Sequence, residues 1–327
     1  METEINGLNV LSLFDGISCG YLALKRSGIE INNYYASEIE ASSIKISKNN
    51  YNDIIHIGNV EKVEYNNGIL KTEYGSYNVG TIDLLFGGSP CQSLSIICKD
   101  RLNLDGKSKL FFEYVRILNQ VKPKYFLFEN VYSMNSESMH IISENLGYLP
   151  IMIDSRDFSA QERKRYYWTN IPINKILNKC ELVLSDILED EKSVPSKYYY
   201  IGKTLSDIDM SKPVCCKIGL SDNIFDYVCR VRNPKFKSCT LTCGGTGGHH
   251  QVKVYLDGMV RKLTPIEYER LQTLPDNYTE GVSDSARYNA IGNAWTVDVI
   301  AHILSGINSN IDNNISCSRF IVNNKLL

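Results

Sequence analysis

Short apolar runs alternate with stretches of helical pattern along the first half of this chain, and this alternation constrains the fold more than any other feature. Apolar runs recur at 8–14, 34–37, 53–57, 82–86, 124–129, 149–153 and 165–169, with helix-like stretches at 19–27, 41–50, 108–120 and 137–146. Strand–helix alternation at this spacing favours right-handed βαβ units. Continuous apolar strands are typical of a sheet covered on both faces. We therefore predict an α/β fold with a mostly parallel sheet between two layers of helices.

The pattern changes after Asn170. Residues 173–261 are richer in Asn, Asp, Ser and Gly and show no strand–helix alternation, whereas helix-like segments return at 265–274 and at about 295–305. We expect two domains. The larger one comprises 1–172 and 262–309, a smaller irregular one comprises 173–261, and a polar C-terminal tail covers 310–327.

Charge is segregated along the chain although its sum is small. The formal net charge is −2, which argues against a protein that coats nucleic acid nonspecifically. Residues 229–262 nevertheless carry seven Lys or Arg against one acid, Asp257. This segment predicts a localised basic face. The ten cysteines without a recognisable secretory signal indicate reduced thiols and a cytoplasmic location. No apolar stretch approaches the roughly 18 residues of a membrane helix, so we expect no membrane partner.

The segment after the first predicted strand has the features of a nucleoside site. Asp15-Gly16 follows the strand and Gly20 begins a helix, so a ligand could approach the backbone closely. Glu38 ends the next strand, where an acid commonly binds ribose hydroxyls. Asp15 would repel a phosphate, which favours a nucleoside with a cationic or amino-acid end. The alternative is a glycine-rich turn such as any α/β protein contains.

Three further segments carry candidate catalytic residues. Cys91 follows Pro90 at the end of a buried strand, where a thiolate nucleophile is favoured. Glu129 ends another strand at the same predicted edge and could hold a proton. Arg163 and Arg165 alternate, so on a strand both would point to one face and bind an anion or a polarised carbonyl. The alternatives are an inert buried thiol, a capping or salt-bridged acid, and a solvated charged edge.

In their order, these segments resemble the cytosine-5 DNA methyltransferase family. FDGISCG resembles the cofactor loop of the family, GGSPCQSLS its proline-cysteine motif, FENV its glutamate motif and QERKR its arginine motif. The resemblance continues through RKLTPIEYERLQTLPDNY and YNAIGNAWTVDVI, and covers nearly all of 8–305. The residues of these motifs are most similar to those of the catalytic domain of animal de novo DNA methyltransferases, and the chain length suits a bacterial or phage enzyme. The resemblance implies a Rossmann-like sheet.

The resemblance also implies S-adenosyl-L-methionine as cofactor, S-adenosyl-L-homocysteine as product, and no metal. Glu38 would bind the ribose and Ile39 would lie against the adenine. Asn59 stands where relatives often have an aspartate that reads the adenine amino group. The cofactor residues expected in this way are Phe14, Asp15, Gly16, Ile17, Glu38, Ile39, Asn59, Val60, Pro90, Leu110, Asn293, Ala294 and Trp295.

For catalysis, the resemblance implies that Cys91 attacks ring carbon 6 of a cytosine flipped out of the duplex. Glu129 would donate to ring nitrogen 3, and Arg165, with Arg163 nearby, would hold the base carbonyl. Residues 173–261 would recognise the target, and Lys235, Lys237 and Lys253 would contact phosphates. The DNA-binding residues expected are Ser89, Gln92, Ser93, Arg230, Arg232, Lys235, Thr240, Thr242, Gly244 and Gly245.

Several alternatives stay open. Cys239, Cys243, His249 and His250 do not have the spacing of a usual zinc site, so we expect no metal there. A related enzyme acting on transfer RNA typically lacks so large a recognition segment. A catalytically dead DNA-binding regulator and a nicotinamide oxidoreductase are the other readings, and the absence of GxGxxG disfavours the latter. We expect a monomer that binds double-stranded DNA, in a restriction-modification or phage self-protection system, with a cognate restriction endonuclease as a further partner.

Overall fold

The computed structural model describes residues 7–90, 109–219, 225–243 and 250–308, and short strands at 314–315, 321–322 and 325–326. The chain forms two compact units. Unit 1 comprises Met1–Ile153, Lys164–Lys175 and Asp298–Leu327, and unit 2 comprises Asp154–Arg163 and Ile176–Val297. Residues 262–297 are assigned to unit 2 together with 176–261. The functional division into domains stays a prediction.

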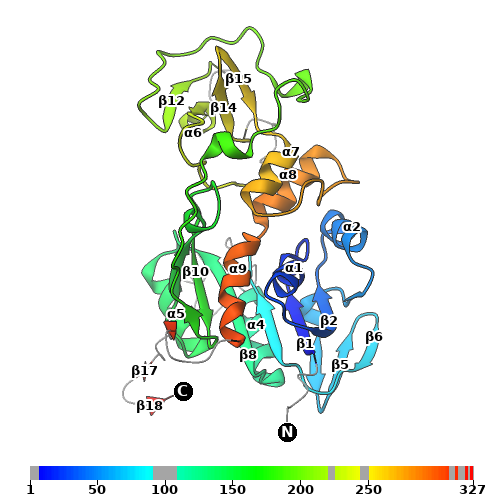
Figure 1. Ribbon diagram of the computed structural model, residues 1–327. Helices are drawn as coiled ribbons and strands as arrows, with labels where there is room; N and C mark the ends of the chain where they lie inside the picture. Colours follow the sequence, from blue (N-terminus) through cyan, green and yellow to red (C-terminus); the bar gives the residue numbers. More distant parts are fainter. Residues whose placement is uncertain are drawn as a thin grey trace. The chain divides into compact units, whose positions relative to one another are not determined.

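Unit 1 is built on a seven-stranded sheet that contains all seven predicted strands (Figure 1). Its order is β3-β2-β1-β7-β8-β10-β9, and β3, β2, β1, β7 and β8 pair in parallel. Strand β10 runs antiparallel to β8, which makes the sheet mostly parallel, as expected. The strands are β1 (Leu8–Leu13), β2 (Ile31–Ser37), β3 (Ile54–His56), β7 (Leu84–Gly87), β8 (Tyr125–Val131), β9 (Ile151–Asp154) and β10 (Lys164–Thr169).

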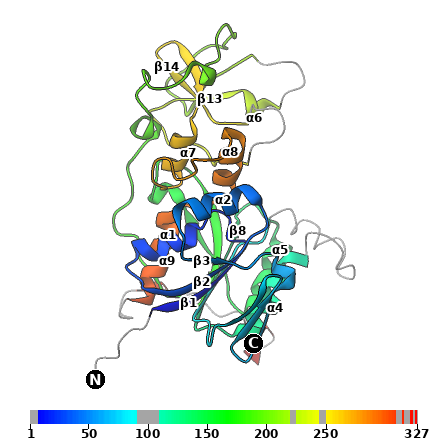
Figure 2. The ribbon, with the colours of Figure 1, turned by 90° about the vertical axis from the view of Figure 1, so that its right-hand side faces the viewer.

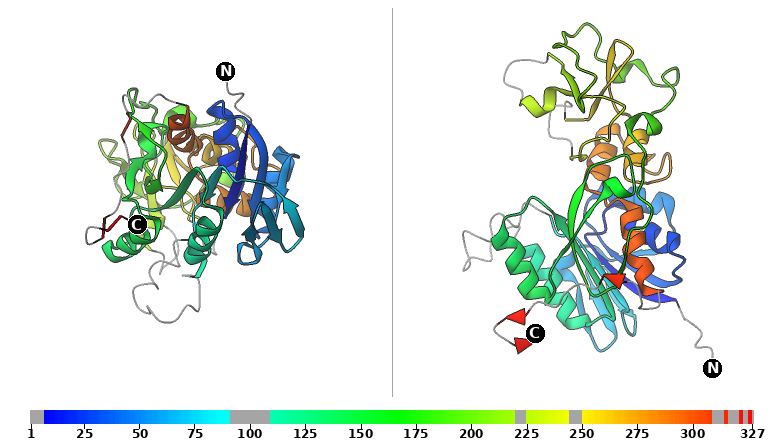
Figure 3. Two further views of the ribbon diagram at one scale, coloured as in Figure 1. Left: turned by 90° about the horizontal axis from the view of Figure 1, so that it is seen from below. Right: turned by 60° about the vertical axis from the view of Figure 1, so that its left-hand side comes forward.

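Helices cover both faces of this sheet. In Figure 2, α4 (Lys109–Val121) and α5 (Ser136–Leu146) lie on one face, and α1 (Cys19–Arg26) and α9 (Val297–Leu304) on the other. The right-hand view of Figure 3 agrees. Helix α2 (Ala41–Asn50) connects β2 to β3. Buried Phe111, Tyr114, Ile117 and Val121 recur at helical spacing along α4 and pack on the apolar strands.

The sequence did not indicate the small antiparallel sheet of β4 (Glu64–Asn66), β5 (Ile69–Thr72) and β6 (Gly75–Asn78). It follows the 3-10 helix η1 (Val60–Lys62). Its strands are too short and polar to stand out, but Asn67-Gly68, both at positive φ, is the turn signal that could have located it. The Arg116 guanidinium of α4 donates to the Val63 carbonyl at 2.8 Å and so ties this sheet to the core. The turn between β5 and β6 is therefore part of unit 1.

Unit 2 contains a four-stranded sheet in the order β12-β13-β14-β15 and a pair of helices. Helix α7, which lies in the predicted helix-like segment 265–274, begins with a capping box of Thr264 and Glu267, whereas α8 was not expected. Tyr268 of α7 packs edge-on against Tyr288 of α8, with ring centroids 4.7 Å apart. The elements are β12 (Val214–Lys217), α6 (Asp226–Cys229), β13 (Arg230–Arg232), β14 (Lys253–Leu256), β15 (Met259–Lys262), α7 (Pro265–Leu271) and α8 (Asp284–Asn293).

The remaining elements are short. Strand β11 (Ile173–Asn174) pairs with β16 (Asn314–Ile315), and β17 (Ile321–Val322) pairs with β18 (Lys325–Leu326). The described residues also contain the 3-10 turns η3 (Ser155–Asp157), η4 (Leu184–Ile187), η5 (Ser196–Tyr198) and η6 (Ser305–Ile307). One described stretch, Asp284–Ile307, is long and apolar enough to span a membrane by composition, but 61% of its apolar window is buried inside the protein. Buried helices in a protein core also meet this criterion of length and composition.

Candidate active site

The loop after β1 has an unusual backbone. Phe14, Gly16 and Ser18 have φ values of 58°, 60° and 62°, and strain of this kind in residues other than glycine gathers at functional sites. The Asp15 carboxylate holds the loop in place, because it accepts hydrogen bonds from Ser12 at 2.6 Å, Ser18 at 2.5 Å and Tyr34 at 2.7 Å. Burial raises the pKa of Asp15, while the three hydroxyls oppose that shift. Asp15 therefore supports the loop, in addition to any contact with a ligand.

Glu38 joins this loop to the end of β2. One of its carboxylate oxygens accepts the Gly16 N–H at 2.8 Å, and the other accepts the N–H groups of Ile39 and Glu40 at 2.7 and 2.8 Å. A Cβ on Gly16 would meet no atom within 4 Å, so the space beside the loop is open, and Ile39 is 72% exposed. An acceptor carboxylate, an open backbone cradle and an exposed apolar side chain fit a nucleoside with an amino-acid end.

The other expected cofactor residues differ in what they can offer. The Asn59 Oδ1 accepts the Glu61 N–H at 3.0 Å and so caps η1. The side chains of Ile17 and Val60 are buried in unit 1, which leaves their backbone for a ligand. Phe14 and Leu110 are half-buried and Pro90 is exposed, all in unit 1, whereas Asn293, Ala294 and Trp295 belong to unit 2.

The glutamate motif supports the backbone that leads to the cysteine. The Asn130 Nδ2 donates to the Ser89 carbonyl at 3.1 Å, which ties β8 to the chain after β7. Gly87 is required there, because a Cβ would lie 2.4 Å from the Tyr114 ring. Ser89, expected to bind DNA, is buried, and its Oγ has no hydrogen-bond partner among the residues that the structure describes. Cys91, Gln92 and Ser93 lie outside the described residues.

Glu129 and Arg165 form an ion pair on adjacent strands. Antiparallel pairing of β8 with β10 brings them together, and the Arg165 Nε lies 3.0 Å from the Glu129 Oε1. Their side chains are 12% and 14% exposed, so the pair is largely shielded from water yet still accessible. It presents a carboxyl group and guanidinium donors to the same place.

Arg163 has a different environment from Arg165. Its buried guanidinium donates to the Leu241 carbonyl at 2.9 Å and to the Gly292 and Ala294 carbonyls at 3.1 Å each. These bonds hold the 240–242 loop against the end of α8, within unit 2. The sequence had suggested that Arg163 holds the substrate; the structure gives it the contacts of a positioning residue.

Two glutamines that sequence reasoning passed over support the same loop. The Gln161 Oε1 accepts the Leu241 N–H at 2.9 Å, and its Nε2 donates to the Gln272 Oε1 at 3.2 Å. Gln272 in turn donates to the Ile291 and Ala294 carbonyls at 3.0 and 3.1 Å. Gln161 is the first residue of QERKR, so the motif itself was the signal that could have found it.

Apart from Ser89, the described residues that were expected to bind DNA belong to unit 2. Arg230 and Lys235 are exposed, and Arg232 is half-buried. Arg230 pairs with Asp226 at 2.9 Å. The Thr240 hydroxyl donates to the Glu162 carbonyl at 2.7 Å, whereas Thr242 is exposed. Gly244 and Gly245 lie outside the described residues.

The expectation that Lys237 and Lys253 contact phosphates is wrong. The Lys237 ammonium donates to three backbone carbonyls, those of Ser159, Cys180 and Leu182. Lys253 is only 1% exposed and donates to the Val228 carbonyl at 2.8 Å. The basic composition of 229–262 could not reveal this, because the carbonyl groups that bind a lysine ammonium cannot be identified from composition.

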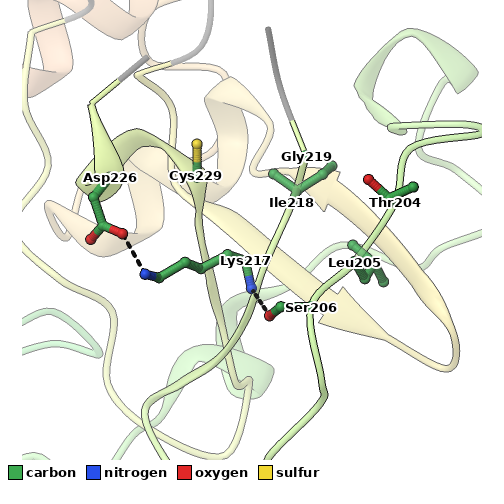
Figure 4. A pocket seen from close by; sticks show the side chains of 8 residues that line it. All are labelled: Thr204, Leu205, Ser206, Lys217, Ile218, Gly219, Asp226 and Cys229. Atoms are coloured by element: carbon green, nitrogen blue, oxygen red, sulfur yellow. Dashed lines mark hydrogen bonds and ion pairs between the residues drawn. The ribbon is translucent and has the colours of Figure 1, made fainter. Parts of the chain in front are cut away.

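A cavity of about 490 Å³ lies beside β12 in unit 2 (Figure 4). An ion pair between Lys217 and Asp226, 2.5 Å long, crosses one side of it. The other lining residues are Thr204, Leu205, Ser206, Ile218, Gly219 and Cys229. Within the described part of the chain, no three His, Cys, Asp or Glu side chains are grouped to hold a metal ion, and His249 lies outside that part.

Comparisons with known proteins identify the family. Residues 8–309 match the model of the C-5 cytosine-specific DNA methylases. The chain is 26% identical to the type II methyltransferase M.HpaII of Haemophilus parainfluenzae, over 89% of this chain and 86% of the relative. It is 25% identical to M.HhaI of Haemophilus parahaemolyticus, over 95% and 97%.

Solved structures agree on the fold. S. pombe Dnmt2 methyltransferase matches with a TM-score of 0.62 at 19% identity, over 92% of this chain and 98% of that one. A prophage-encoded E. coli protein assigned as a DNA modification methyltransferase matches with a TM-score of 0.66 at 19% identity, over 92% and 99%. The chain therefore belongs to the C-5 cytosine-specific DNA methylase family.

Proposed function

We propose that this chain is a DNA (cytosine-5-)-methyltransferase that transfers a methyl group from S-adenosyl-L-methionine to carbon 5 of a cytosine in double-stranded DNA. The match of residues 8–309 to the family carries this proposal. The Glu129–Arg165 pair supports it, because a carboxyl beside a guanidinium can hold the edge of a pyrimidine.

The cofactor would be held by the loops after β1 and β2. Glu38 would accept from the ribose hydroxyls, and the open side of Gly16 would admit the amino-acid end. When bound, S-adenosyl-L-methionine supplies an electrophilic methyl group on a sulfonium. The Asp15 carboxylate keeps the loop in shape through its three hydroxyl partners.

Cys91 would form the covalent bond to the base. The target cytosine leaves the stack, because its ring carbons are not accessible inside it. The Cys91 thiolate bonds to carbon 6, and the electron pair displaced onto the ring is stabilised as Glu129 donates to nitrogen 3. Carbon 5, which the addition makes nucleophilic, would then take the methyl group from the sulfonium, and S-adenosyl-L-homocysteine would be left as product. Loss of the carbon 5 proton restores the double bond and expels the thiolate, so the enzyme is regenerated.

Arg163 and Arg165 would have separate tasks in this scheme. Arg165, anchored by Glu129, would hold the base carbonyl. Arg163 would keep the 240–242 loop in position through its three carbonyl partners. Exposed Arg230, Lys235 and Thr242 would contact DNA from that unit.

The thiol is tested by replacement. We expect Cys91→Ser to abolish methyl transfer to duplex DNA while binding of S-adenosyl-L-homocysteine, measured by calorimetry, is retained, because the nucleophile is not a cofactor ligand. Duplex DNA with 5-fluorocytosine at the target should become covalently attached to the native chain when the methyl donor is present, since fluorine cannot leave as the proton does. Loss of binding together with transfer would count against this role.

The substrate is tested by transfer of tritium from labelled cofactor to duplex DNA and, in parallel, to transfer RNA. Label in RNA alone would replace the proposal with the RNA-modifying alternative. For the biological role we propose protection of host or phage DNA, because the relatives are named type II methyltransferases. We further propose that the chain acts in the cytoplasm and as a monomer. Methylcytosine-sensitive sequencing of DNA from a host that expresses the chain would reveal the target sequence. A restriction endonuclease that cuts this sequence would be the cognate partner.

A further inference from the structure

The carboxyl ends of three neighbouring strands form a row in unit 1. Strands β1, β2 and β3 are adjacent in the sheet, and they end in the Asp15-Gly16 loop, in Glu38 and in Gly58-Asn59. An adenosyl ligand with its amino-acid end at β1 and its ribose on Glu38 has its base directed toward β3. This step rests on the proposed function.

Hydrogen bonds hold the β3 end close to Glu38. The Ile57 N–H donates to the Ala36 carbonyl at 2.9 Å, and the Ser37 hydroxyl donates to the Gly58 carbonyl at 2.7 Å. The backbone of Gly58 and Asn59 is therefore fixed beside the residue that precedes Glu38. A polar group beside Gly58 would therefore lie at the end of β3, toward which the adenine base is directed.

That group is the carboxylate of Glu73, from the turn between β5 and β6. A Cβ on Gly58 would lie 1.7 Å from the Glu73 Oε1 and 2.6 Å from its Cδ, so the glycine leaves the space that the carboxylate occupies. The Asn59 N–H donates to the Glu73 Oε1 at 2.8 Å and fixes its position. Glu73 is an exposed residue of this turn, and a carboxylate that accepts one hydrogen bond keeps further acceptor sites.

Asn59, the residue at the position where the sequence suggested an adenine contact, has its acceptor oxygen on the Glu61 N–H. A carboxylate accepts hydrogen bonds and donates none, and its two oxygens have about four acceptor sites. The 6-amino group of adenine is a donor, whereas the 6-oxo group of hypoxanthine or guanine is an acceptor that a carboxylate repels. We propose that Glu73 accepts a hydrogen bond from the adenine amino group of the cofactor and selects adenine over 6-oxopurines.

The test compares two ligands that differ only at that position. Calorimetry gives the Kd of S-adenosyl-L-homocysteine and of S-inosyl-L-homocysteine for the native chain, Glu73→Gln and the control Glu64→Gln, an exposed acid on β4. We expect the native chain and the control to prefer the adenosyl compound by about tenfold or more, the usual effect of a hydrogen bond to a charged group. Glu73→Gln should lose most of this preference, because the glutamine amide can donate to the 6-oxo group while its oxygen still accepts the Asn59 N–H.

Two results would overturn the inference. If Glu73→Gln keeps the native preference, or weakens both ligands equally, Glu73 only braces the β3 end. If the native chain binds neither ligand and transfers no label to DNA or RNA, the proposed function itself fails. If Glu73→Gln binds both ligands normally and still prefers the adenosyl compound, the role of Glu73 is refuted while the proposed function stands.

Discussion

At the residue scale, Lys253 places an ammonium group inside unit 2. Burial lowers its pKa from the ordinary 10.5 to about 8. Between these two values the unfolded chain holds a proton that the folded chain has released. The free energy of unfolding contributed by this residue therefore rises with pH across that window, by up to about 1.4 kcal/mol per unit. Below pH 8 both states are protonated and the contribution is constant.

Lys253→Met should remove this dependence, because methionine fills a similar volume without a titratable group. We expect the difference in unfolding free energy between the native chain and the variant to grow in favour of the native chain as the pH rises from 8 to 10. Denaturant titrations at pH 7, 8, 9 and 10 measure it, with exposed Lys235→Met as the control. A difference that stays constant over this range would show that the folded ammonium titrates normally.

At the scale of elements, Gly292 lets the end of α8 approach the loop that Arg163 holds. A Cβ there would lie 2.6 Å from the Thr242 carbonyl group and from the Cys243 nitrogen, all backbone atoms that cannot rotate away. Alanine in place of glycine ordinarily stabilises a helix by up to about 1 kcal/mol. At Gly292 the overlap reverses the sign.

We expect Gly292→Ala to lower the free energy of unfolding by about 1–3 kcal/mol. It should also weaken DNA binding, since the displaced loop carries Thr240 and Thr242. Denaturant unfolding and hydrogen exchange of the 240–243 amides measure the two effects, with Asn289→Ala on the same helix as the control. A variant as stable as the native chain, with unchanged exchange, would contradict the close approach.

At the scale of the whole molecule, neither unit is one continuous segment of chain. Residues 154–163 belong to unit 2, where the Ser238 N–H donates to the Ala160 carbonyl at 2.7 Å and the Glu162 N–H to the Ser238 carbonyl at 2.8 Å. With Gln161 and Arg163, they provide one side of the 238–242 loop. Unit 2 should therefore depend on a segment that is distant in sequence.

We expect the fragment 176–297 to lack a cooperative unfolding transition, because the partners of its 238–242 backbone are missing. Attaching residues 154–163 through a flexible linker in place of 164–175 should restore one. Circular dichroism during thermal unfolding compares the two fragments. Cooperative unfolding of both with the same midpoint would contradict this dependence.

The sequence by itself determined the seven strands of unit 1, the helices α1, α2, α4 and α5 and the family, because these depend on local apolar periodicity and on motifs that lie within a few residues. Only the tertiary structure decided that Lys237 binds carbonyls and Lys253 is buried, that Arg163 binds carbonyls while Arg165 binds Glu129, and that Glu73 reaches Gly58. Each of these outcomes depends on which backbone and side-chain groups meet across the fold. A side chain keeps the same place in the sequence whether its partner is water, a carbonyl or a ligand, so its role is settled only when distant segments pack together.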